Sequence, residues 1–136
     1  MLFLAVSFLL ARFLSTENTE RDADLVLIQA QARGDVAGML AQLSGCRTST
    51  SCLALVRANA ANPRLRRPGA VKILSLKSST AYSLTGGSGK TRLAWTVIGK
   101  LPVVQCIQVR RSGNFFKGVS VTLLSLSAPI SNEADC

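Results

Sequence analysis

The sequence predicts an α+β domain in which helices come first and a four-stranded, curved antiparallel sheet follows. Apolar residues recur at helix-type spacing up to residue 61, and helix-ending signals interrupt them. From Val71 onward, apolar and polar residues alternate instead, as they do in strands with one buried face. The links between these strands are short, which favours antiparallel neighbours.

Three helices are expected, at residues 1–33, 36–43 and 51–61. The first carries acids early in 16–33 and a base at its end, which suits the helix dipole, and Gly34 follows it as a C′ glycine. Asp35 can cap the second helix, and Ser49 or Thr50 the third. Asn62 precedes a proline and stops the third helix.

Four strands are expected, at residues 71–84, 92–98, 103–111 and 115–126. In the third strand Val103, Gln105, Ile107 and Val109 share one face. The glycine-rich residues 86–89 and the Ser-Gly-Asn run at 112–114 are expected to form turns. Alternation breaks at Leu124 and Leu126, which predicts a bulge near the end of the fourth strand or a strand end that is covered on both faces.

Residues 86–91 do not satisfy the phosphate-loop pattern. That pattern requires a glycine five positions before Gly89, where Leu84 stands, and a helix directly after the loop. The residues that follow predict a strand. A hairpin turn therefore accounts for this segment better than a nucleotide site does.

Composition argues against catalysis. The chain carries a net charge of +9 and no histidine, and no carboxylate side chain occurs between Val36 and Asn132. The usual general base and the paired carboxylates of acid–base enzymes are therefore missing from the sheet. Candidate pocket residues are Tyr82, Trp95 and Gln105, although Gln105 can equally cap a sheet edge. We expect no enzyme activity, no metal site and no cofactor.

The four cysteines predict two disulfides. Their spacing does not fit zinc sites, so we pair Cys46 with Cys52 and Cys106 with Cys136. Disulfides indicate an oxidising compartment and hence export. The alternative is four buried thiols in a cytosolic protein.

The first 14 residues are apolar except for Ser7 and Arg12. This run is shorter than the roughly 20 residues of a bilayer span, and it lacks the charge and cleavage pattern of a signal peptide. We predict a single-pass membrane anchor at 1–18, whose first residues could lie upstream, and an extracytoplasmic domain at 19–136. The alternative is a core helix of a soluble domain.

The densest basic patch consists of five residues: Arg64, Arg66, Arg67, Lys72 and Lys77. Aromatic residues, which stack on bases, do not interleave with these charges, so sequence-specific nucleic-acid binding is not expected. An anionic lipid or an envelope polymer suits the patch better. A solvated linker is the simpler alternative.

Three segments carry a family resemblance: residues 32–35 (Ala-Arg-Gly-Asp), residues 101–106 (Leu-Pro-Val-Val-Gln-Cys) and the Asp-Cys tail at 135–136. With helices before a curved sheet, the chain resembles the NTF2-like (cystatin-like) superfamily over about 20–130, and in particular its membrane-anchored bacterial envelope proteins. Enzymes of that superfamily use pocket carboxylates or histidines, which this region lacks.

The resemblance implies a non-catalytic, membrane-anchored envelope domain that binds a ligand, a protein partner or further copies of itself. One alternative is a scaffold subunit of a secretion or conjugation complex in the membrane. The other alternative is a small NTF2-like enzyme.

Overall fold

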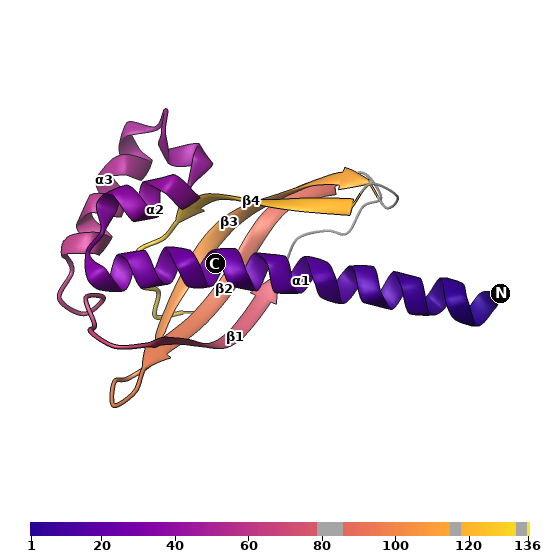
Figure 1. Ribbon diagram of the computed structural model, residues 1–136. Helices are drawn as coiled ribbons and strands as arrows, with labels where there is room; N and C mark the ends of the chain where they lie inside the picture. The colour runs from indigo at the N-terminus through magenta and orange to yellow at the C-terminus, as the bar shows by residue number, and fades with distance from the viewer. Residues whose placement is uncertain (79–85, 115–117, 133–135) are drawn as a thin grey trace.

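The computed structural model describes residues 1–78, 86–114, 118–132 and 136. Three α-helices and one 3-10 turn precede four strands, so the predicted α+β class is confirmed (Figure 1). The helical elements are α1 (Leu2–Arg33), α2 (Val36–Gln42), η1 (Ser44–Cys46) and α3 (Thr50–Ala61). The strands are β1 (Val71–Ser78), β2 (Gly86–Val97), β3 (Val103–Asn114) and β4 (Gly118–Leu126).

The predicted ends of the helices are confirmed. Gly34 adopts φ 71°, a left-handed conformation that ends α1. The carboxylate of Asp35 accepts a hydrogen bond from the Gly38 backbone N–H at 2.9 Å and so caps α2. Ser49 caps α3 by accepting from the Cys52 N–H at 3.3 Å.

The sheet is an antiparallel meander in the order β1-β2-β3-β4. Register shifts beside Leu74 and Leu124 place one unpaired residue in β1 and one in β4, so the predicted bulge near Leu124 is confirmed. These bulges adjust which side chains of the edge strands face the core.

Two expected turns are strand segments instead. Gly86 pairs with Ser112, and Asn114 pairs with Gly118, so β2 and β3 extend through both polar runs. Backbone hydrogen bonds form the ladder whatever the side chains are, and Gly113 accommodates φ 114° inside it. Part of the expected first strand, 79–84, lies outside the described residues.

The core lies between the sheet and the second half of α1. Leu27 and Ile28 of α1 are fully buried in one cluster with Leu93, Trp95 and Ile107 of the sheet. The first half of α1 continues past the end of the sheet (Figure 1). One helix of 32 residues therefore has a packed half and a projecting half.

Helices α2 and α3 pack around the β4 side of the sheet. Leu43 forms an isolated parallel bridge with Leu123, so the segment before η1 borders β4. A Cβ at Gly45 would lie 2.6 Å from the Leu124 carbonyl oxygen, and this close approach requires glycine. Both predicted disulfide pairs are present, Cys46–Cys52 in this segment and Cys106–Cys136 between β3 and the tail.

Candidate functional site

The projecting half of α1 exposes large apolar side chains. Leu2, Phe3, Leu4 and Leu10 have exposed fractions of 83%, 81%, 69% and 58%. Successive helical residues are 100° apart, so these positions are distributed around the helix rather than along one stripe. The projection, residues 2–11, therefore exposes apolar side chains on all sides with Ser7 as its polar residue, which is unfavourable in water.

None of the described helices combines the length and the apolarity that crossing a bilayer requires.

A buried ion pair lies where α1 first meets the sheet. The Arg111 Nη2 of β3 lies 2.5 Å from the Glu20 Oε2 of α1, and the Thr91 hydroxyl of β2 donates to Glu20 Oε1 at 2.5 Å. Glu20 and Thr91 are fully buried, and Arg111 is 6% exposed. The pair therefore fixes the base of the projection to the sheet in a low-dielectric environment.

Asp24 lies one helical turn after Glu20 and is also fully buried. Neither of its carboxylate oxygens has a hydrogen-bond partner among the described residues. Burial, with a smaller contribution from the nearby Glu20 carboxylate, raises the pKa of Asp24 to about 8. Asp24 is thus mostly protonated at neutral pH.

Sequence patterns contained an indirect signal for this cluster. Glu20 and Asp24 precede Leu27, Ile28 and Gln31 at the spacing of one helix face, and those three residues are buried. Thr91 and Arg111 extend the inward alternation of β2 and β3 by one further position each. The prediction missed them because polar residues at a strand end are normally assigned to solvent.

The predicted pocket residues Trp95 and Gln105 form a buried network instead. The indole Nε1–H of Trp95 donates to Gln105 Oε1 at 2.9 Å, and the amides of Gln105 and Gln31 exchange hydrogen bonds at 2.9 and 3.1 Å. Gln105 Nε2 also donates to the Ser127 carbonyl oxygen at 2.9 Å. Both side chains are fully buried in the core, and Tyr82 lies outside the described residues.

The five predicted basic residues are divided between two places. Arg66 and Arg67 line a shallow hollow together with Arg33 near the C-terminal end of α1, and Arg64 is exposed close by. Arg67 lies over the Trp95 ring, with its guanidinium carbon 5.4 Å from the ring centroid. Lys72 and Lys77 are exposed on β1 instead. The guanidinium of Arg67 thus has a packing role.

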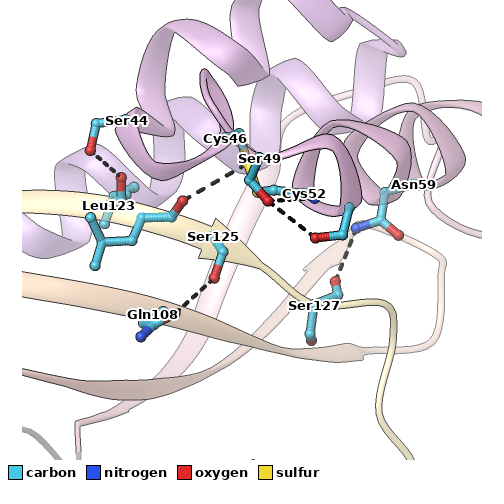
Figure 2. Close-up of a disulfide and its surroundings, with 11 residues drawn as sticks. Ser44, Cys46, Ser49, Cys52, Asn59, Gln108, Leu123, Ser125 and Ser127 are labelled. Atoms are coloured by element: carbon cyan, nitrogen blue, oxygen red, sulfur yellow. Dashed lines mark hydrogen bonds between the residues drawn. A yellow bond between two sulfur atoms is a disulfide. The ribbon is translucent and has the colours of Figure 1, made fainter.

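A groove of about 600 Å³ runs between the start of α3 and the outer side of β3 and β4. Figure 2 shows the Cys46–Cys52 disulfide beside it, with Ser125 donating to Gln108 and Asn59 donating to the Ser127 carbonyl. Leucine and cysteine side chains form part of its lining, and its polar groups include hydroxyls, one amide and two cations, from Ser49, Ser51, Ser125, Gln108, Lys90 and Arg110. This lining suits an anionic or hydroxyl-rich group.

The part of the chain that the structure describes offers no cluster of acids or cysteines for metal binding. No group of three Asp, Glu, Cys or His side chains that could hold a metal ion occurs there. The two nearby carboxylates, Glu20 and Asp24, are buried and line none of the hollows described above.

The chain was compared with protein-family models, with curated proteins and with solved structures, and none of them matched. Evidence for its function therefore comes from the projection, the buried cluster and the distribution of charge.

Proposed function

We propose that this protein is a membrane-anchored domain with a non-catalytic binding or scaffolding role. The observation that carries the proposal is the exposed projection at 2–11, apolar except for Ser7, which continues without a break into the folded domain. A helix that is apolar on every side belongs in a core or in lipid, whereas one lying flat on a membrane has a polar face. Insertion along the helix axis follows.

The proposed location of the folded domain, residues 19–136, is extracytoplasmic. Two disulfides join cysteines that are 6 and 30 residues apart in the sequence, and such bonds persist in oxidising compartments. The proposed fold relationship is to the NTF2-like superfamily. Helices before an antiparallel sheet, with α1 packed on one face, support that relationship.

A non-catalytic role is supported by the composition of the described hollows. The polar groups that described residues contribute to the groove beside the Cys46–Cys52 disulfide are hydroxyls, an amide and cations. Its serine hydroxyls would need a base to act as nucleophiles, and none of the described residues that line the groove is a histidine or a carboxylate. Binding through hydrogen bonds and charge is the chemistry that remains.

The proposal is tested by flotation with phosphatidylcholine vesicles. Leu4→Ser with Leu10→Ser removes two exposed apolar side chains from the projection. Burial of a leucine is worth about 1.5–3 kcal/mol, so the double variant should bind vesicles at least about 100-fold more weakly than the wild type.

A matched control uses the turn between β2 and β3. Ile98 and Leu101 are 91% and 82% exposed there, and Ile98→Ser with Leu101→Ser makes the same chemical change away from the projection. This control should bind as the wild type does. Wild-type protein that stays in the lipid-free fraction would refute the anchor. Self-association of that lipid-free protein through the projection would favour a scaffold subunit instead.

A further inference from the structure

We propose that the membrane that receives α1 is anionic, and that Lys77, Lys90 and Arg110 contact its headgroups. This inference rests on the membrane role proposed above and adds the class of lipid and the orientation of the domain. The three cations lie at what we call the near end of the sheet, the end where Thr91 and Arg111 meet Glu20. Their side chains are exposed.

Two sets of contacts establish how α1 lies along β3. Glu20 meets Arg111 near one end, and Gln31 meets Gln105 further along. Eleven helical residues rise about 16 Å and six strand residues about 20 Å, so the two elements run roughly antiparallel over this stretch. The near end of the sheet therefore faces the same way as the projection, as Figure 1 shows.

Measured along the axis of α1, the near-end cations lie close to the position where the exposed apolar side chains of the projection begin. Leu14 precedes Glu20 by six residues, or about 9 Å along the helix. Lys90 and Arg110 are the sequence neighbours of Thr91 and Arg111, and the pairing of Ser78 with Thr91 brings Lys77 to the same end. The distance of about 9 Å is comparable with the Debye length of about 10 Å at 0.1 M salt.

The basic linker lies too far away to contribute. The Arg67 backbone N–H donates to the Ala32 carbonyl oxygen, 18 residues and about 27 Å beyond Leu14 along α1. Arg64 and Lys100 belong to this far end, because the Arg67 guanidinium bonds to the carbonyls of Arg64 and Leu101. Over nearly three Debye lengths their charges are screened from the bilayer.

Three acidic side chains near this end that the structure describes, Glu20, Asp22 and Asp24, each have their charge balanced or suppressed. Glu20 is paired with Arg111, and burial keeps Asp24 protonated at neutral pH. Asp22 is an exposed acid on α1, and the adjacent exposed Arg21 balances it. Lys90 and Arg110 also line the groove that holds Ser49 and Ser51, so a phosphate there would meet cations and hydroxyl donors together.

The experiment compares two double variants that change net charge equally. Lys90→Gln with Arg110→Gln removes near-end cations, and Arg64→Gln with Lys100→Gln removes far-end ones. Binding is titrated at 0.1 M salt with vesicles of phosphatidylcholine alone or mixed with phosphatidylglycerol. The near-end variant should bind the mixed vesicles about 30-fold more weakly than the wild type, since each juxtamembrane cation contributes about fivefold. The far-end variant should change binding less than about threefold.

Each outcome supports or overturns a particular claim. Equal losses in both variants would show a net-charge effect and overturn the orientation. Wild-type binding that is equal on both kinds of vesicle would overturn the anionic preference while leaving the membrane role intact. Failure to bind either vesicle would instead refute the membrane role. High salt should abolish the difference between the near-end variant and the wild type.

Discussion

At the scale of single residues, the buried ionisable side chains of α1 are the least expected feature. Glu20 is balanced by Arg111 and receives a hydrogen bond from Thr91, whereas Asp24 is buried without a described partner. A carboxylate that ionises in such a place loses its hydration. The pKa of Asp24 is therefore raised to about 8, and the side chain stays mostly protonated below that pH. The contact between α1 and the sheet should therefore weaken in alkali.

Substitution of Asp24 tests whether its burial makes the stability of the protein depend on pH. Because its folded-state pKa of about 8 exceeds its ordinary value of 3.8, the folded protein binds more protons than the unfolded chain between these values. The free energy of unfolding should then fall as the pH rises from about 4 to about 8. Asp24→Asn should flatten that slope and stabilise the protein near pH 8 by a few kcal/mol, roughly 1.4 kcal/mol per pKa unit. Urea unfolding at a series of pH values measures it.

Asp22→Asn is the matched control, because Asp22 is exposed on the same helix two residues away. The free energy of unfolding of this control should depend on pH as that of the wild type does. An Asp24→Asn protein with the wild-type pH dependence would mean that Asp24 ionises freely in the folded state.

At the scale of elements, the helices were predictable and the strand ends were not. Caps at Gly34, Asp35 and Ser49 depend on local chemistry, which the sequence contains. The ladder past Gly86 and Ser112 depends on the neighbouring strands already being in register. Turn-forming residues cannot reveal that register, so both polar segments were wrongly expected to be turns.

The two disulfides should differ in what they contribute. Cys46–Cys52 closes six residues and Cys106–Cys136 closes 30. In the chain-entropy treatment these loops give about 2 and about 4 kcal/mol of stability respectively. Replacing both cysteines of each pair with alanine and measuring urea unfolding should reproduce that order, and a reducing agent should remove the difference from the wild type. An equal or reversed order would show that local packing outweighs loop length.

At the scale of the whole molecule, one long helix connects an apolar projection to a cationic domain. Composition revealed both properties separately, and the cysteine pairing was predictable from spacing. The orientation was not, because it depends on which cations lie level with Glu20 and which lie level with Ala32. The densest cluster of basic residues in the sequence is Arg64, Arg66 and Arg67. The fold instead brings Lys77, Lys90 and Arg110 to the end of the sheet nearest the projection.

Membrane anchoring requires the projection to enter lipid while the β2–β3 turn stays in water. Single tryptophans introduced as Leu4→Trp and as Ile98→Trp, both at exposed positions, report on the two ends. With vesicles whose acyl chains carry bromine, the added emission of Leu4→Trp should be strongly quenched, and that of Ile98→Trp should match its value in unbrominated vesicles. The native Trp95, fully buried, provides the common background. Quenching at position 98 equal to or greater than that at position 4, or at neither, would contradict the account.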